Sequence, residues 1–492
     1  MNHALRRVSL ICLVLFVLLL VNVNYVQGFE ASSLANEPGN GRTFTSTLQF
    51  QRGSIITADQ KTVAYSKMNK TFGEYQRHYP FGKMYAPITG YDTLFSQTGI
   101  EQTENKELSG SDPALAVHNL IDLITGKQKK GATVELTINS VAQQAAYNAL
   151  KTQGKQAGVV ALNPQTGAVL ATASYPSFDP NQLATLNGTK LIANDKQLLK
   201  DPNQPLLNRA LNATFPPGSS FKVVTSSTAM TDKGINPNTQ VFAPTQLKLP
   251  GAPQPLVNFD GEACGNGSGR VPLITAFTLS CNTAFGNLGL HLSAAQLQRQ
   301  ANLFGFNNPN LTIPLPVTPS NFPLYPDPAQ RAGAAIGQES DTVTPLQEAM
   351  VAAAIANQGT LMKPYMVDKV TAPDLTALST TQPTVLSHPV TPAVATNVTN
   401  MMIQVTQSPQ GTAHVSAGTQ ATGGIVIAAK TGTAQNGINN SGLDDAVFTC
   451  FAPASNPKIA VGVVVKGGGQ GADAAAPIAV KIITAYLAAV GN

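Results

Sequence analysis

The first strong pattern along the chain is an apolar run close to its start. Arg6 and Arg7 precede a hydrophobic segment, Val8–Val26, whose densest part is Leu10–Val21. Such a run behind basic residues is either the hydrophobic region of a signal peptide or a short transmembrane anchor. We interpret it as the only membrane-spanning segment, a single-pass signal anchor in the cell membrane, and the pattern leaves its cleavage open. Because basic flanks stay in the cytoplasm, residues 1–7 are expected inside and the rest of the chain outside.

From about residue 157 onwards, strand-like and helix-like periodicities follow one another. Strands at 158–163 and 168–173, joined by a turn, have the length and flanking pattern of a β-hairpin. Helical periodicity then dominates before strand patterns return. The expected helices are 219–233, 272–300, 344–358 and 477–490, and the later expected strands are 424–430, 446–451 and 459–466. We expect an α+β domain in which the hairpin and the last strands share one antiparallel sheet flanked by helices.

The segment before this domain mixes short strands, turns and loops. Strand candidates are Thr43–Phe50 and Val134–Ile138, and the second runs into a helix at Asn139–Lys151. Glu101 and Glu104 are interpreted as exposed surface charges, because carboxylates are seldom buried. The predicted parts are a cytoplasmic tail at 1–7, a transmembrane segment at 8–26, a smaller, mostly β N-terminal domain at 27–155 and the α+β domain at 156–492.

Composition excludes some partners. The 492 residues carry a net charge of +5, and the longest basic stretch, Lys127–Lys130, is short and interrupted by Gln128, so nothing supports nucleic-acid binding. Of four cysteines, Cys12 lies in the apolar leader, and three are too few for a disulfide scaffold. A Cys264–Cys281 disulfide is plausible in an oxidising compartment, but the sequence leaves it undecided.

The heptapeptide Pro216–Lys222 is the first candidate for chemistry. Two prolines and a glycine precede a helix-compatible run, which places Ser219 near a helix N-terminus and Lys222 one turn later on the same face. A serine hydroxyl needs an adjacent base to act as a nucleophile, and a lysine with a lowered pKa can be that base. Taken alone, the stretch is more typical of a serine cap followed by an exposed lysine.

Two further polar segments gain meaning only together with the first. Ser280-Cys281-Asn282 is expected at a turn or helix junction, because its serine and asparagine are two residues apart. Lys430-Thr431-Gly432-Thr433 follows an apolar strand, so both threonines share one face and could hold a carboxylate. A phosphate-binding loop that ends in Lys430-Thr431 is rejected, because Ala429 stands where that loop needs glycine.

Ser-x-x-Lys, Ser-x-Asn and Lys-Thr-Gly, in this order, are the signature of penicillin-binding proteins and serine β-lactamases. The chain resembles class B penicillin-binding proteins, most of all the shorter penicillin-binding protein A type of actinobacteria. Further similar stretches are Arg52-Gly53, Asn208-Arg209-Ala210, Ile336-Gly337-Gln338 and Thr344-Pro345-Leu346-Gln347. The resemblance implies a transpeptidase domain behind a dimerisation or pedestal-like N-terminal domain.

The resemblance also implies roles for the acylation of the enzyme. Ser219 would attack the carbonyl between the terminal D-alanines of a peptidoglycan stem peptide, and Lys222 would take its proton. Ser280 would relay a proton to the leaving D-alanine, and Lys430 would orient Ser280. Backbone N–H groups of Ser219 and Thr433 would hold the oxyanion.

Substrate binding is implied for the remaining motif residues. Asn282 would bond the peptide amide of the substrate, and the segment Thr431, Gly432 and Thr433 would receive its terminal carboxylate. An amine of a neighbouring stem peptide would then resolve the ester, and β-lactams would acylate the same serine. The family needs no cofactor or metal.

Three alternatives stay open at this level. A D,D-carboxypeptidase or a β-lactamase would use the same acyl-enzyme, and a β-lactam-binding sensor or scaffold of a cell-wall complex would use only its formation. The expected protein partners are a membrane glycosyltransferase and division or elongation proteins, docked on the N-terminal domain.

Overall fold

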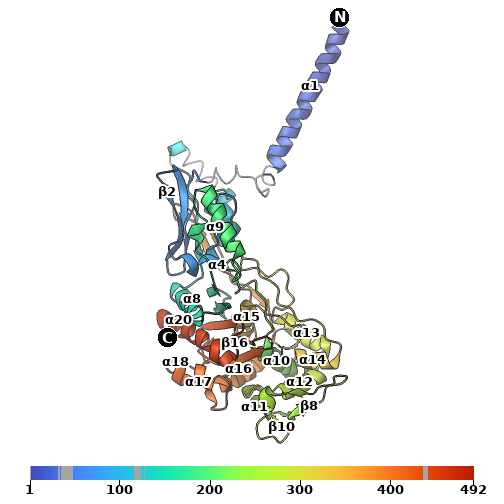
Figure 1. The fold of residues 1–492 in the computed structure, drawn as a ribbon. Helices are drawn as coiled ribbons and strands as arrows, with labels where there is room; N and C mark the ends of the chain where they lie inside the picture. The colour runs from blue at the N-terminus through green and yellow to red at the C-terminus, as the bar shows by residue number, and fades with distance from the viewer. Residues whose placement is uncertain are drawn as a thin grey trace.

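The structure is a computed structural model that describes residues 2–30, 34, 48–115, 124–126, 128–435 and 442–491. The strand expected at Thr43–Phe50 falls mostly outside these ranges, and its described end, Leu48–Phe50, is a turn. The strand β2 (Thr62–Asn69) and the helix α9 (Gly188–Lys200) lie at one end of the folded part (Figure 1). The sheet of the larger domain, which contains β16 (Asp445–Ala452), lies between them and the opposite end.

The apolar leader forms one long helix, α1 (Asn2–Tyr25), which continues in a short π-helical turn, Val26–Glu30 (Figure 1). Its span, Leu5–Glu30, is long and apolar enough to cross a membrane, and none of its most apolar window is buried. Within the described residues Gly471–Val490 also meets these criteria, which corrects the expectation of a single candidate. More than half of that second window is buried, as in a core helix.

The larger domain is built on a five-stranded antiparallel sheet. Its strand order is β15-β16-β17-β5-β6, so the first hairpin and the last strands share one sheet, as predicted. The strands are β5 (Ala157–Leu162), β6 (Val169–Tyr175), β15 (Ala428–Ala434), β16 (Asp445–Ala452) and β17 (Ile459–Val465). Every residue of β5, β16 and β17 is buried, which requires packed elements on both faces of the sheet.

Helices provide this cover. The central helix α15 (Pro345–Ala356) packs against β5, β16 and β17. The helices α8 (Ser140–Gln153) and α20 (Ala476–Val490) pack against each other and against β6 and β17 respectively. Asn139 caps α8 by accepting hydrogen bonds from two backbone N–H groups, and Gly154 ends it in the left-handed conformation.

A second sheet of six strands combines distant parts of the chain. Its order is β13-β12-β4-β1-β2-β3. The strands are β1 (Ile55–Ile56), β2, β3 (Glu74–His78), β4 (Thr133–Leu136), β12 (Val367–Thr371) and β13 (Ala377–Thr380). The antiparallel pairing of β4 with β12 brings a segment from the second half of the chain into the N-terminal sheet, which the sequence pattern did not predict.

The interpretation of Glu101 as a surface charge is wrong. Its carboxylate is fully buried and lies 2.6 Å from Arg52 Nε and 2.6 Å from Arg77 Nε. The two guanidinium groups hold the pKa of Glu101 below its usual value, even though burial opposes this. Glu104 is half-buried, and burial followed by repulsion from Glu107 raises its pKa to about 7.

Candidate active site

Ser219 lies on a tight turn that precedes a helix. The turn Gly218–Phe221 is 3₁₀-helical, and α10 (Lys222–Lys233) starts directly after it, so the helix predicted from Ser219 begins three residues later. Gly218 has a φ of +55° and donates its N–H to the Gly337 carbonyl at 2.9 Å. The turn is therefore fixed by a backbone contact as well as by the prolines before it.

Lys222 connects this turn to the second motif. Its Nζ lies 2.6 Å from the Ser280 carbonyl oxygen, 3.2 Å from Ser280 Oγ and 2.8 Å from Asn282 Oδ1. The side chain is fully buried. Burial, followed by repulsion from Lys430, lowers the pKa of Lys222 well below its usual value. A neutral amine is therefore favoured at this position.

Ser280 occupies the predicted helix junction, between α11 (Leu273–Thr278) and α12 (Asn282–His291). Its φ of +59° lies in the left-handed region, where a side chain other than glycine is strained. Cys281, the next residue, forms a disulfide with Cys264, which confirms the pairing that the sequence left undecided.

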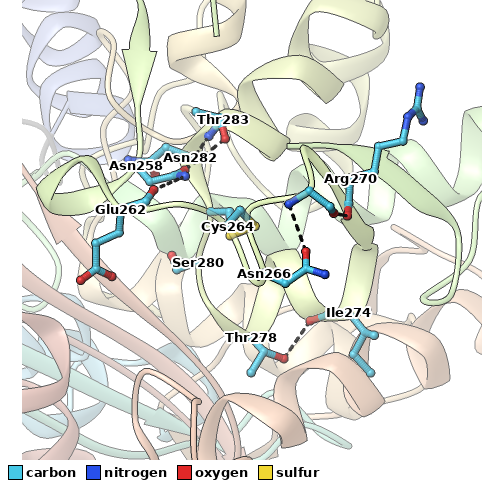
Figure 2. The surroundings of a disulfide bond; sticks show 12 residues. Asn258, Glu262, Cys264, Asn266, Arg270, Ile274, Thr278, Ser280, Asn282 and Thr283 are labelled. Atoms are coloured by element: carbon cyan, nitrogen blue, oxygen red, sulfur yellow. Dashed lines mark hydrogen bonds between the residues drawn. A yellow bond between two sulfur atoms is a disulfide. The ribbon is translucent and has the colours of Figure 1, made fainter. Parts of the chain in front are cut away.

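The disulfide ties this junction to a neighbouring loop (Figure 2). Asn258 of that loop accepts a hydrogen bond from the Thr283 N–H at 3.0 Å, and Asn282 Nδ2 donates to the Val257 carbonyl at 3.2 Å. The strained Ser280 conformation is thus held between a covalent bond and two hydrogen bonds to the start of α12.

The third motif lies on β15, beside the other two. Lys430 Nζ donates to Ser280 Oγ at 2.9 Å, so both lysines reach one hydroxyl. Burial lowers the pKa of Lys430 to about 7. The strand starts at Ala428 and not at the predicted Gly424, because Gly424, with a φ of +97°, belongs to the preceding turn.

Gly432 is the point of closest approach between β15 and the turn of Ser219. A Cβ atom at Gly432 would lie 2.8 Å from the Pro217 carbonyl oxygen. A side chain at position 432 would therefore collide with the backbone of this turn.

The three motifs open onto one cleft of about 1270 Å³. Its lining includes Ser219, Ser280, Asn282, Thr431 and Thr433, so five of the eight predicted site residues face the same space. Lys222, Lys430 and Gly432 are not part of this lining; both lysines contact Ser280, and Gly432 lies against the turn that carries Ser219.

Gln338 and Thr412 also line the cleft, and neither was among the predicted site residues. Gln338 Nε2 donates to the Thr433 carbonyl at 3.1 Å, and the Thr412 and Thr431 hydroxyls lie 2.7 Å apart. The Ile336-Gly337-Gln338 stretch signalled the first through its family resemblance, whereas no sequence pattern marked Thr412.

Comparison with known families agrees with this geometry. Residues 157–484 match the penicillin-binding protein transpeptidase domain, and residues 52–134 match the penicillin-binding protein A dimerisation domain. The chain belongs to the penicillin-binding proteins. Its resemblance to class B members, and the α+β transpeptidase fold with an N-terminal dimerisation domain, are confirmed.

Among relatives, this penicillin-binding protein is 41% identical to peptidoglycan D,D-transpeptidase PbpA of Mycolicibacterium smegmatis over 99% of both chains. It is 39% identical to PbpA of Mycobacterium tuberculosis, again over 99% of both chains. The ceftriaxone acyl-enzyme complex of penicillin-binding protein A from M. tuberculosis superposes with a TM-score of 0.85 at 38% identity, and the match covers 90% of this chain and 99% of that chain.

Proposed function

We propose that this penicillin-binding protein is a peptidoglycan D,D-transpeptidase that cross-links stem peptides through an acyl-enzyme on Ser219. The convergence of Lys222 and Lys430 on Ser280 Oγ, next to the turn of Ser219, is the observation that carries the proposal. PbpA of M. smegmatis bears the same activity in its name.

Proton counting supports Lys222 as the base. A neutral amine has two protons and one lone pair, and the Ser280 carbonyl oxygen and Asn282 Oδ1 can each accept one proton. The lone pair is then left for a hydroxyl. In the acylation step Ser219 Oγ bonds to the donor carbonyl carbon, its proton passes to Lys222, and the carbonyl oxygen becomes an oxyanion.

The same residues account for the collapse of this intermediate. Backbone N–H groups of Ser219 and Thr433 hold the oxyanion, and such a donor is typically worth about 3 kcal/mol. The proton on Lys222 passes through Ser280 to the D-alanine nitrogen as the carbon–nitrogen bond breaks. Asn282, Thr431 and Thr433 hold the peptide amide and the terminal carboxylate, where the cleft provides hydroxyl and amide groups.

The second half of the reaction releases the enzyme. An amine of a neighbouring stem peptide attacks the Ser219 ester and gives a proton to Lys222. The new amide forms as the carbon–oxygen bond to Ser219 breaks, and Lys222 returns that proton to Ser219 Oγ. Water in place of the amine would give carboxypeptidase activity, and fast hydrolysis of a β-lactam ester would give β-lactamase activity.

We further propose that α1 anchors the protein with residues 1–7 in the cytoplasm and residues 27–492 outside it. The length and apolar character of the helix and the two arginines before its densest part support this orientation. The residues 27–155 are then available to partner proteins, namely a membrane glycosyltransferase and division or elongation proteins. Phe72, which is exposed at the turn between β2 and β3, is a candidate contact residue for these partners. Phe72→Asp is therefore expected to weaken co-purification of the glycosyltransferase.

Intact-mass measurement after exposure to penicillin G tests the activity. The wild type is expected to gain the mass of one penicillin and to keep it, and Ser219→Ala is expected to gain none. Rapid loss of the adduct would assign the protein to the β-lactamases, and its absence from the wild type would refute the proposed mechanism. The product of two stem peptides, measured by mass spectrometry, separates cross-linking from carboxypeptidase activity.

A further inference from the structure

A buried carboxyl group lies directly beneath the nucleophile turn and has no part in the mechanism above. Glu348 belongs to the mostly apolar helix α15 and is 3% exposed. One of its carboxyl oxygens, Oε1, lies 2.7 Å from Ser220 Oγ, and Ser220 is itself 2% exposed.

The hydroxyl of Ser220 has more partners than it has protons. Its Oγ lies 2.8 Å from the Pro217 carbonyl oxygen and 2.7 Å from the Glu348 carboxyl. A hydroxyl donates one proton, and the Pro217 carbonyl can only accept. Both contacts are satisfied at once only if the Glu348 carboxyl supplies a proton of its own.

We propose that Glu348 is a neutral carboxylic acid that positions Ser219, by donating to Ser220 Oγ while Ser220 donates to the Pro217 carbonyl. Pro217 and Ser220 flank Gly218-Ser219, so this relay closes the turn around the nucleophile. The inference rests on the proposed function, because it deepens the role of the same serine.

The support of Glu348 is rigid. A Cβ atom at Gly462 of β17 would lie 2.3 Å from the Pro345 carbonyl oxygen and 2.7 Å from Glu348 Cβ, so α15 lies directly on the sheet at this point. The Thr449 hydroxyl of β16 donates to the Glu348 carbonyl oxygen at 2.7 Å. The relay therefore connects the turn of Ser219 to the centre of the domain.

In the part of the chain that the structure describes, no cationic side chain pairs with Glu348. The helix α15 packs against β5, β11 (Leu361–Met362), β16, β17 and α16 (Pro392–Gln407), and among these described elements the titratable side chains are Asp445 and Cys450 of β16. The turn that carries Ser220 has none, and Lys222 follows it. Burial raises the pKa of Glu348 to about 8.

Ionisation of Glu348 would reverse the relay. A carboxylate would take the proton of Ser220, and the Pro217 carbonyl would lose its donor. Glu348→Gln keeps a donating N–H at every pH, and Glu348→Leu removes the donor at every pH. The two variants therefore separate the hydrogen bond from the side-chain volume.

The test compares second-order rate constants for acylation by penicillin G in the full-length protein between about pH 6 and pH 9.5. The ratio of Glu348→Gln to wild type is expected to stay near one below about pH 7 and to rise several-fold above about pH 8, where wild-type Glu348 ionises. Glu348→Leu is expected to be about tenfold slower than wild type at pH 7, the value of one net hydrogen bond. Thr449→Val is the control, because it removes a different hydrogen bond to the same residue. The ratio of its rate constant to that of the wild type is expected to stay constant with pH.

Infrared difference spectra at pH 7 give a reading that does not depend on acylation. The band of a neutral carboxylic acid is expected in the wild type and in Thr449→Val and is expected to be weaker in Glu348→Gln. An unchanged band in Glu348→Gln, or a ratio of rate constants that is flat with pH, would overturn the inference. Failure of the wild type to react with penicillin would instead refute the proposed function, and the infrared band would still report on Glu348.

Discussion

At the scale of single residues, the site depends on groups that are charged in water but lie in a dry interior. Lys222 and Lys430 both have fully buried side chains, and they share Ser280 as a hydrogen-bond partner. Burial penalises their charged forms, so each folded-state pKa lies below the ordinary value of lysine. The chemistry and the stability of the protein are therefore coupled to the same protons.

For Lys430 this coupling predicts a pH dependence of stability. Its pKa is about 7 in the folded protein against an ordinary value of 10.5. Between these values the unfolded chain binds a proton that the folded protein does not, so the free energy of unfolding rises with pH. The contribution is on the order of 5 kcal/mol, fully present above the unfolded pKa and lost as pH falls to about 7.

Thermal unfolding of the wild type and Lys430→Met between about pH 7 and pH 10 checks this expectation. The melting temperature of the wild type is expected to rise relative to that of Lys430→Met across this window. Lys222 and Glu348 titrate in both proteins, so their contributions largely cancel in the comparison. If the melting temperatures of the two proteins changed in parallel with pH, Lys430 would keep its charge in the folded protein.

Residue types predicted the motif chemistry but not the burial of carboxylates. Ser219, Lys222, Ser280 and Lys430 were found because their order along the chain is unusual in combination. Glu101 was misassigned, because its two arginine partners lie at distant positions in the sequence and only the fold brings them together.

At the scale of elements, the turn of Ser219 is held by backbone contacts at glycines. A Cβ atom at Gly337 would lie 2.2 Å from the Gly218 carbonyl oxygen, and one at Gly218 would lie 2.7 Å from the Thr433 carbonyl oxygen. Three segments that are distant in sequence thus meet without intervening side chains. This contact sets the distance between the nucleophile and β15.

Gly337→Ala is expected to slow acylation by penicillin G by at least about 100-fold, because an error of about 1 Å in the placement of reacting groups has this effect. Gly154→Ala is the matched control, since Gly154 has a φ of +73° against +75° at Gly337 but has no atom within 4 Å of its added Cβ. Both variants place an alanine at nearly the same positive φ, and only the Cβ atom of Gly337→Ala would meet the turn of Ser219. Equal acylation rates in the two variants would contradict this assignment.

Helices and strands with clear periodicity were predicted closely, as β5, β16, β17 and α20 show. The junctions were less predictable, because their geometry depends on contacts across the fold. The turn before α10 and the late start of β15 follow from Gly218 and Gly424, whose positive φ values no periodicity reports.

At the scale of the whole molecule, the two sheets do not follow the predicted boundary at residue 155. The strands β12 and β13 extend the N-terminal sheet, and α8 packs on β6 and α20. Leu191 of α9 shares a small apolar core with Ala86. Periodicity could reveal that 367–371 is extended but not which sheet it joins, because pairing between distant strands leaves no local pattern.

This arrangement predicts that residues 48–155, expressed alone, do not fold cooperatively. The β4 edge would lack its partner β12, and the apolar face of α8 would be exposed. Circular dichroism during thermal unfolding is the measurement, with the span 48–491 as the control. A sharp unfolding transition in the short fragment would contradict the prediction.

The pairing of β4 with β12 also constrains the order of events during synthesis. Leu136 ends β4 and Val367 begins β12, so most of the chain leaves the ribosome before the N-terminal sheet can be completed. Until then, the unpaired edge of β4 is a template for pairing with other chains. Contacts between such distant segments also slow folding, because a long loop must close before they form. A helper protein that shields the nascent edge would therefore benefit this chain more than one whose N-terminal domain folds by itself.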